Sequence, residues 1–294
     1  MADATDRSLI SAAQLNRHKV TYRVVLTVVI VIFTLIFIGP LYFLFTDGLK
    51  STSEAVQVPP TTVPAHLHPG TYASAWSRVG IGRLLVNTLY YAFGALAFQL
   101  VFDVAAAYSL SRLRPVLGNV IFALMLATLM IPATVLVVPQ YVTVSDLPLL
   151  HLNLIGSPEA IWLPSVANAF NIFLLKRFFD SIPAELLSAA AIDGASPLRT
   201  LRSVVLPISR PIISVVSIFS LVAVWKDFLW PLLVEYGYNP NRETLNVGIF
   251  EAASTTPQNL VLAASAMAAV PTLVFFLFFQ RNILSGLTAG SLKG

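Results

Sequence analysis

Charged side chains that interrupt long apolar stretches are the first candidates for chemistry in this chain. Lys226 and Asp227 stand together in one such stretch, and Asp103 stands in another. A charge at the centre of a bilayer costs about 2.5 to 3.5 kcal/mol on insertion scales, so these groups must face a cavity, a partner or a neighbouring helix. Successive helical positions lie about 100° apart, so Lys226 and Asp227 are not expected to pair with each other. Either one lines a pathway while the other bonds a neighbouring helix, or both are structural. Asp103 is expected to serve helix packing or a gate.

Several kinds of chemistry are excluded by what the sequence lacks. Cysteine is absent, which excludes a disulfide framework, a thiolate nucleophile and a cysteine-ligated zinc or iron–sulfur site. No Gly-x-x-x-x-Gly-Lys-Ser/Thr sequence occurs, so this chain is not expected to hold ATP itself. His66 and His68 have no third ligand within sequence reach, so we expect an ordinary polar loop there and no metal site.

The composition indicates whether the chain is surrounded by water or by lipid. Of the 294 residues, 56% are hydrophobic and 11% are charged, whereas about a quarter are charged in an average soluble domain. So few charges cannot coat a soluble core of this size, which excludes an ordinary water-soluble enzyme and indicates a largely lipid environment. A net charge of +4 would suggest nucleic acid in a soluble protein. Here the basic residues flank apolar stretches, so no nucleic-acid partner is expected.

Six apolar stretches reach the roughly 20 residues that a helix needs to cross a hydrocarbon core of about 30 Å. They predict an all-α polytopic membrane protein with six transmembrane helices, at positions 24–45, 84–110, 116–138, 158–178, 211–234 and 260–279. The first stretch has 22 residues. It is longer than the apolar region of a signal peptide, at about 7 to 15 residues, so a span is favoured over a cleaved signal.

The basic residues orient these spans. With the amino terminus inside, 13 of the 18 Lys and Arg residues are cytoplasmic, four are outside and Lys226 lies within a span. Positively charged loops are retained in the cytoplasm, so both termini are expected there. The predicted divisions are a cytoplasmic segment at 1–23, a transmembrane domain at 24–282 and a cytoplasmic tail at 283–294.

The outer segment 46–83 is longer than a connector needs to be. It contains Val58-Pro59-Pro60 and His68-Pro69-Gly70. Such residues fix turns and an extended path, so we expect a strap and not a globular domain.

The inner segment 180–210 predicts two short helices joined by a corner. Ser181 is the expected cap of an alanine-rich helix that Gly194 ends. Ser196 and Pro197 then open a second helix, which Pro207 is expected to break. A glycine among alanines lets another protein's backbone approach closely, which predicts a docking surface. The alternative is a hairpin that lies on the lipid headgroups.

The sequence around this corner resembles a known family. Ala189-Ala190-Ala191-Ile192-Asp193-Gly194-Ala195, followed by Leu206-Pro207, is similar to the EAA loop of binding-protein-dependent ABC importer permeases. Further similar segments are Ala107-Tyr108-Ser109-Leu110-Ser111-Arg112-Leu113, Met130-Ile131-Pro132, Trp225-Lys226-Asp227-Phe228-Leu229-Trp230-Pro231-Leu232 and Gly286-Leu287-Thr288-Ala289-Gly290. The last two resemble the carbohydrate branch, in particular the second permease subunit of maltose-type importers.

The resemblance implies a multi-pass subunit of a prokaryotic cytoplasmic membrane that is not an enzyme. A second permease subunit would complete the pathway, an external solute-binding protein would deliver a carbohydrate, and two ATPase subunits would hold ATP and Mg. This chain would bind no cofactor. The coupling helix of the family docks on the ATPase, and the positions matching it are Glu185, Ser188, Ala189, Ala190, Asp193, Gly194 and Ala195.

Two positions depart from the family pattern. Leu187 and Ser188 stand where the family usually has a glutamate before the alanine pair, and only Glu185 lies nearby. A partly exposed ion pair is worth only about 0 to 1 kcal/mol, so docking need not depend on that acid. Lys226 stands where the family often has asparagine.

Sugar recognition combines aromatic faces with amide or carboxylate hydrogen bonds. The pathway candidates of those types are Asn168, Asn171, Trp225 and Asp227. The alternative functions are an importer permease for glycerol phosphate, a self-sufficient secondary transporter, and a membrane scaffold without transport. No inverted repeat of the kind that secondary transporters use is visible in the sequence.

Overall fold

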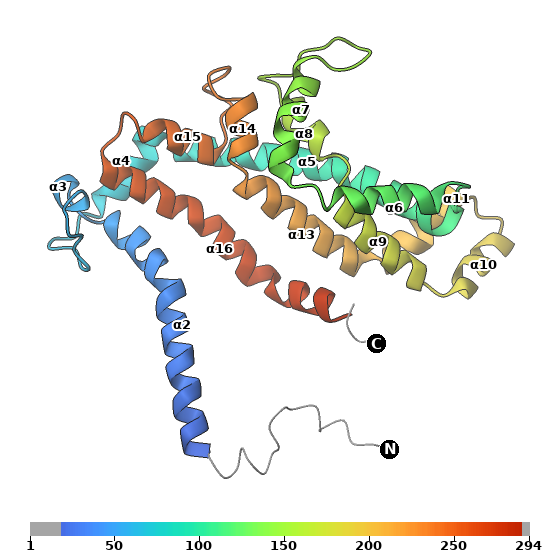
Figure 1. Cartoon of the computed structure of the whole chain (residues 1–294), viewed down its shortest axis with the longest axis horizontal. Coiled ribbons are helices and arrows are strands. Elements are labelled where there is room, and N and C mark those ends of the chain that lie inside the picture. Colours follow the sequence, from blue (N-terminus) through green and yellow to red (C-terminus); the bar gives the residue numbers. More distant parts are fainter. Residues whose placement is uncertain (1–18, 290–294) are drawn as a thin grey trace. The chain divides into compact units, whose positions relative to one another are not determined.

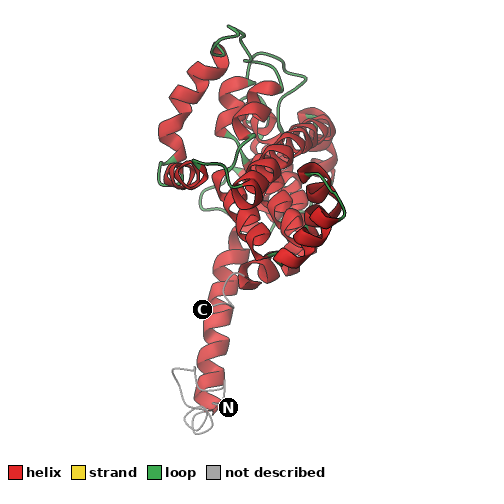
Figure 2. Cartoon of the chain, turned by 90° about the vertical axis from the view of Figure 1, so that its right-hand side faces the viewer, coloured by secondary structure: helices red, strands yellow, loops and turns green. Residues whose placement is uncertain are grey.

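A computed structural model describes residues 19–289, with side chains up to residue 280. Every regular element in that part of the chain is a helix (Figures 1 and 2), and the described strand pairing is a single bridge between Leu147 and Leu152. The described part of the chain forms two compact units, one of residues 19–74 with 257–266 and one of residues 75–256 with 267–289. The prediction of an all-α polytopic membrane protein is confirmed.

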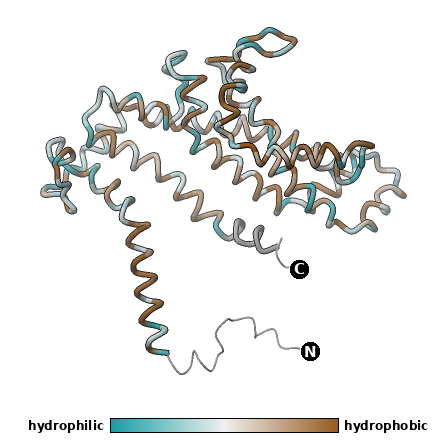
Figure 3. Tube along the Cα trace, in the orientation of Figure 1, coloured by the Kyte–Doolittle hydropathy of each residue, from teal (hydrophilic) through white to brown (hydrophobic). Residues whose placement is uncertain are grey.

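The first unit begins with the long apolar helix α2 (Lys19–Asp47), whose hydrophobic residues are evident in Figure 3. None of its residues is buried within the chain, as expected for a helix that faces lipid. After it, Lys50 is buried and its ammonium binds the Asp47 carboxylate at 2.5 Å and the Thr61 carbonyl at 2.5 Å. The Asn259 side chain, at the start of α16 (Gln258–Ala289), donates to the Lys50 carbonyl at 3.1 Å.

The expected strap at 46–83 is partly helical, which corrects the prediction of an extended path. It contains α3 (Thr52–Ala55) and the ten-residue α4 (Gly70–Val79). The Ser51 hydroxyl accepts from the Glu54 amide and caps α3. The prediction of an extended path relied on the prolines and did not take this cap into account.

The second unit is organised around α5 (Ile81–Tyr108), which continues into a π-helical turn, η1 (Ser109–Leu113). α5 packs against α8 (Glu159–Ser165), α9 (Ala169–Ser181) and α13 (Arg210–Lys226). A buried apolar cluster near the end of α5 joins it to α9 and α13: Ala107, Tyr108, Ile172, Leu175, Phe179, Ile182, Val205 and Val216.

The six predicted transmembrane segments are not all continuous helices. Within residues 19–280, three helices are long and apolar enough to cross a membrane: Lys19–Asp47, Ile81–Leu113 and Gln258–Gln280. Two further candidates are bent pairs, so the structure holds three to five candidate spans.

The third predicted span is one of these bent pairs. α6 (Gly118–Thr128) and α7 (Ala133–Ser145) meet at 108°. Pro132 is the N-cap of α7 and has no N–H to continue the helix from α6. The fourth stretch is divided into α8 and α9, which have 7 and 13 residues. The Asn168 side chain accepts from the Asn171 amide and starts α9 anew.

The fifth predicted span ends early, because α13 stops at Lys226 and α14 (Leu229–Val234) follows after a break. Asp227 has an extended backbone, so Lys226 and Asp227 are not successive positions of one helix as predicted. Pro231 has no N–H to offer the Asp227 carbonyl. The Asn246 side chain, from α15 (Leu245–Ala252), donates to that carbonyl at 3.3 Å instead.

Candidate functional site

The inner segment 180–210 forms the predicted pair of helices, with a different start. The first helix is α10 (Ala184–Ile192), and its N-cap is Pro183. Ser181 ends the preceding α9, and its hydroxyl donates to the Phe178 carbonyl at 2.7 Å. The prediction that Ser181 caps the first helix is therefore wrong, because Ile182 and Pro183 separate the two helices with extended backbone.

The corner after α10 is a Schellman motif. Gly194 has φ +72°, the Ala195 amide donates to the Ala190 carbonyl at 2.9 Å, and the Gly194 amide donates to the Ala191 carbonyl at 3.0 Å. This left-handed conformation is strained for residues with a Cβ, which explains the glycine. A Cβ at position 194 would have no heavy atom within 4 Å, so the corner is open to a partner.

The second helix begins as predicted and ends later. The Ser196 hydroxyl accepts from the Arg199 amide and caps α11 (Pro197–Thr200). A π-helical turn, η2 (Leu201–Val205), follows and leads into α12 (Leu206–Ile208), where Pro207 stands in the first turn. A proline is tolerated there, so the chain bends by 82° only after α12 and not at Pro207.

Helix α10 has no buried residue. Of the predicted coupling positions, Glu185, Ser188, Ala189, Asp193 and Gly194 are exposed and Ala190 and Ala195 are half-buried. Apolar side chains flank the corner: Ile192 is 86% exposed and Leu198 is 73% exposed. Exposed apolar residues around an open corner are typical of a protein-binding surface.

Side chains at the end of α5 anchor this loop, and the prediction of coupling residues did not include them. Arg112 of η1 donates from Nη2 to the carbonyls of Phe179 and Ile182, the latter at 2.9 Å. Ser111 donates to the Asp180 carboxylate at 2.6 Å. On the far side of the corner, the Tyr108 hydroxyl donates to the Pro197 carbonyl at 2.9 Å. Both ends of the α10 segment are thereby bonded to one helix.

Asp180 is held as a carboxylate. Partial burial opposes its ionisation, but the Lys176 ammonium at 2.8 Å, the Ser111 hydroxyl and the charge of Arg112 outweigh that penalty. The pKa of Asp180 is therefore lowered from its ordinary value. The anchor stays charged and intact at neutral pH.

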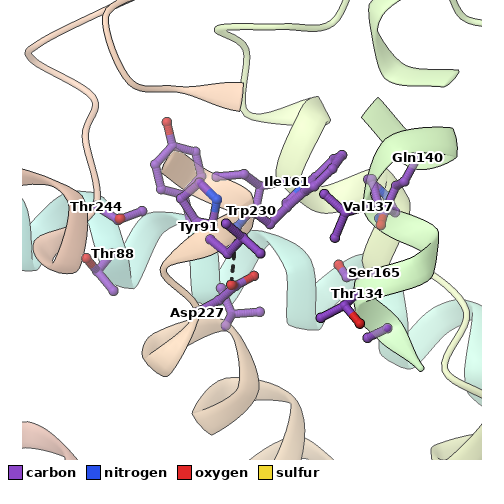
Figure 4. A pocket seen from close by; sticks show the side chains of 15 residues that line it. Thr88, Tyr91, Thr134, Val137, Gln140, Ile161, Ser165, Asp227, Trp230 and Thr244 are labelled. Carbon is purple, nitrogen blue, oxygen red and sulfur yellow. Dashed lines mark hydrogen bonds between the residues drawn. The ribbon is translucent and has the colours of Figure 1, made fainter. Parts of the chain in front are cut away.

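A second candidate site is a cavity of about 280 Å³ in the same unit (Figure 4). Its polar lining consists of Thr88, Thr134, Gln140, Ser165, Asp227 and Thr244, and Tyr91 and Trp230 add aromatic rings. These residues come from α5, α7, α8, α14 and the segments that precede α14 and α15. Among the residues that the structure describes, no Lys, Arg or His lines the cavity.

Hydrogen bonds to the backbone hold the wall of the cavity in place. Trp230 donates from Nε1 to the Ala160 carbonyl at 2.9 Å, and the Thr88 hydroxyl accepts from the Leu245 amide at 2.8 Å. The Trp230 amide donates to the Asp227 carboxylate at 3.4 Å, so Asp227 stands at the start of α14. Thr244, at the N-cap of α15, is 4% exposed, and its hydroxyl has no hydrogen-bond partner among the described residues.

Of the four predicted pathway residues, Asp227 lines the cavity. Trp225 is buried against Phe275, with ring centroids 6.1 Å apart. Asn168 caps α9, and the buried Asn171 donates to the Ser220 hydroxyl at 3.1 Å.

Asp103 belongs with these packing residues. It is fully buried, and its carboxylate accepts from the Asn168 amide at 2.9 Å. This bond joins α5 to the start of α9, and the choice between helix packing and a gate stays a prediction. Within residues 19–280, no group of three His, Cys, Asp or Glu side chains could hold a metal ion.

Comparison with known proteins gives a consistent result. Residues 99–288 match the family described as binding-protein-dependent transport system inner membrane component. The chain is 30% identical over 269 residues to the sn-glycerol-3-phosphate transport system permease protein UgpE of Rhizobium meliloti, which covers 88% of this chain and 93% of the relative. It is also 30% identical over 257 residues to the melibiose/raffinose/stachyose import permease protein MelC of Bacillus subtilis, with 87% and 91% covered.

Among solved structures, a bacterial ABC transporter involved in the import of the acidic polysaccharide alginate is similar in fold. The TM-score is 0.77 at 22% identity, and the match covers 93% of this chain and 99% of the other. A second structure, of the bacterial alginate ABC transporter in complex with an alginate-bound periplasmic protein, has a TM-score of 0.64 at 17% identity.

Proposed function

The chain belongs to the family of binding-protein-dependent transport system inner membrane components, and on that premise we propose that it forms half of the pathway of a carbohydrate importer. Membership makes it a multi-pass permease subunit of an ABC importer in a bacterial inner membrane, with ATP hydrolysis in separate subunits. The proposal adds a second permease subunit, two ATPase subunits that dock on α10, and an external protein that delivers the sugar.

The same proposal includes six crossings with both termini in the cytoplasm. The bent pair of α6 and α7, the broken α8–α9 segment, and α13 with α14 would then each be one crossing, and α11 and α12 would stay in the cytoplasmic loop. The asymmetry of Lys and Arg supports this orientation, because 13 of 18 fall on one side. Broken helices are tolerated at membrane depth where protein or a water-filled cavity covers them.

The observation that carries the proposal is the open corner at Gly194, presented by a helix without buried residues and anchored at both ends. A docked ATPase that moves α10 would pull on Phe179, Ile182 and Pro197. These three carbonyls are bonded to Arg112 and Tyr108, so the movement would pass directly into α5. α5 also carries Thr88 and Tyr91, two residues of the cavity wall.

Cross-linking from α10 tests this function. The chain has no cysteine, so Ser188→Cys introduces a single thiol at an exposed and chemically similar position. A photoactivatable cross-linker attached to this thiol is expected to capture an ATPase subunit in membranes. Ser254→Cys, exposed after α15 on the predicted outer side, is the matched control and should capture none. Capture of phospholipid alone from position 188 would contradict the proposal.

The solute of this importer is open between two classes. The permeases UgpE and MelC are equally identical to the chain, and their names assign them sn-glycerol 3-phosphate and melibiose, raffinose and stachyose, respectively. An importer for a glycerol phosphate is therefore the second candidate function.

A further inference from the structure

The cavity beside Asp227 has a chemistry that separates these two classes. We propose that it binds a neutral, polyhydroxylated unit of the solute and rejects phosphorylated and other anionic solutes. This inference rests on the proposed function, because it takes the cavity to lie on the route of an imported solute.

Charge is the first argument. The 15 residues that line the cavity include one carboxylate and no basic side chain. Phosphate sites in proteins use Arg or Lys, or the free amides of a helix N-terminus. At the start of α14 the Trp230 amide is not free to bind a phosphate, because it donates to the Asp227 carboxylate. A doubly charged phosphate near Asp227 would meet like-charge repulsion in a partly desolvated space.

Two further helix starts reach the cavity: α7 contributes Ala133 and Thr134, and α15 has Thr244 as its N-cap. These are the features that would favour an anion. Neither first turn contains a basic residue, and the anionic reagent in the experiment below tests both helix starts directly.

Hydrogen-bonding capacity is the second argument. The lining offers hydroxyl groups, one amide and one carboxylate, which together supply the donors and acceptors that sugar hydroxyls need. The Thr244 hydroxyl is buried and unpartnered, although buried polar groups are normally paired. A solute hydroxyl in the cavity would supply the missing bond. The half-buried ring of Trp230 adds an apolar face of the kind that sugar rings stack on, whereas the ring of Tyr91 is buried behind the wall.

Size is the third argument. At about 280 Å³ the cavity lies at the lower end of the range for small-molecule sites, roughly 300 to 1,000 Å³. It has room for a single ring or a short polyol, so an oligosaccharide would occupy it one unit at a time.

A pair of thiol reagents tests the proposal on the full chain, assembled with its partner subunits in membranes. Ser165→Cys places a thiol in the cavity. Ser145→Cys is the matched control outside it, because both hydroxyls donate to the carbonyl three residues earlier and position 145 is followed by the exposed carboxylate of Asp146. The probes are a neutral glucosyl methanethiosulfonate and the anionic sulfonatoethyl methanethiosulfonate, with rates normalised to those of a free thiol.

We expect the neutral probe to react at position 165 at least about tenfold faster than the anionic probe, and the two to react at similar rates at position 145. Adding Asp227→Asn to the Ser165→Cys chain should bring the ratio close to that at position 145. Equal or faster labelling by the anionic probe at position 165 would overturn the proposal, and so would the failure of both probes to reach it. Either failure leaves the ATPase captured from position 188, so it is distinguishable from failure of the importer assignment.

Discussion

The inner segment 180–210, here called the coupling loop, and the cavity hold their functional residues in different ways. The loop is one continuous segment, with capped helices and a glycine corner whose geometry is set by bonds between near neighbours. The cavity is assembled from several helices, and side chains bonded to distant carbonyls keep its wall in place. The loop would therefore move as a rigid body, whereas the cavity would change shape when its helices shift. In the proposed importer, ATP hydrolysis would drive the rigid loop and the resulting movement would act on the cavity.

Helix α5 joins the two. Tyr108 lies at its coupling end and Thr88 on the cavity wall, a separation of 20 residues or about 30 Å of helix. Movement of the loop can thus reach the cavity without an intermediate element.

The largest expected effect comes from breaking the rigid part. Gly194→Val should reduce solute uptake at least about tenfold, because a β-branched residue opposes the left-handed backbone by about 1 to 2 kcal/mol and its side chain projects into the open corner. Membrane insertion should not change, since α10 buries no residue. Uptake of radiolabelled solute in vesicles, together with ATPase activity, measures this.

Gly237→Val is the control for backbone strain. Gly237 has φ +78° and likewise has no heavy atom within 4 Å of an added Cβ, but it lies outside the coupling loop. If both variants lose uptake equally, strain and not docking explains the loss at position 194.

An intermediate effect is expected where the loop meets α5. Arg112→Ala leaves the carbonyls of Phe179 and Ile182 without their charged donor, and hydrogen bonds to charged groups are worth about 1.5 to 3 kcal/mol. We expect ATP hydrolysis to continue while uptake falls about fivefold, because the loop then moves without α5. Arg112→Lys should recover part of the uptake. Arg114→Ala, at an exposed neighbouring position, should have little effect, and an equal loss there would remove the anchor from the coupling route.

The smallest effect concerns the segment that leads into the cavity at Thr244. Burial, with the Glu251 carboxylate nearby, raises the pKa of Glu243 to about 7. A raised pKa means that the folded chain disfavours the ionised form, so stability is lost as pH rises from the ordinary value of about 4.3 towards 7. Glu243→Gln removes this penalty. The melting temperature should therefore rise by about 3 °C at pH 8, and the gain should shrink as pH falls to about 4.5.

Glu159→Gln changes an exposed carboxyl and provides the baseline for that measurement. A gain for Glu243→Gln that is the same at both pH values would mean that packing, and not charge, is responsible.

The same contrast explains what the sequence could predict. Gly194, Ser196 and Pro197 act through bonds to residues a few positions away, so their types and spacing were enough to predict two helices and a corner. Ser181 was misassigned because Pro183 can equally stand at the N-cap, a choice that local propensity does not decide.

Contacts between residues far apart in the sequence could not be predicted. Residues 165, 227 and 244 meet at the cavity only because α5, α8 and α13 pack together, and no local pattern encodes that. The breaks at Asn168 and Asp227 also lie in apolar stretches whose composition alone predicts uninterrupted spans. Among the predicted pathway residues, asparagines that cap and pack helices have the same types as asparagines that bind solutes, so composition could not separate them.

The break between α13 and α14 has a mechanical consequence. The Asp227 carbonyl receives no hydrogen bond from Pro231, which has no N–H, and accepts one from the Asn246 side chain of α15 instead. Rotation about the backbone at residues 227 and 228 would therefore turn α14 relative to α13 without breaking a hydrogen bond within either helix. Such a movement would exchange the side-chain bonds of Trp230 and Asn246 and the backbone bond from the Gly156 amide to the Val234 carbonyl, while α13 would keep its own hydrogen bonds.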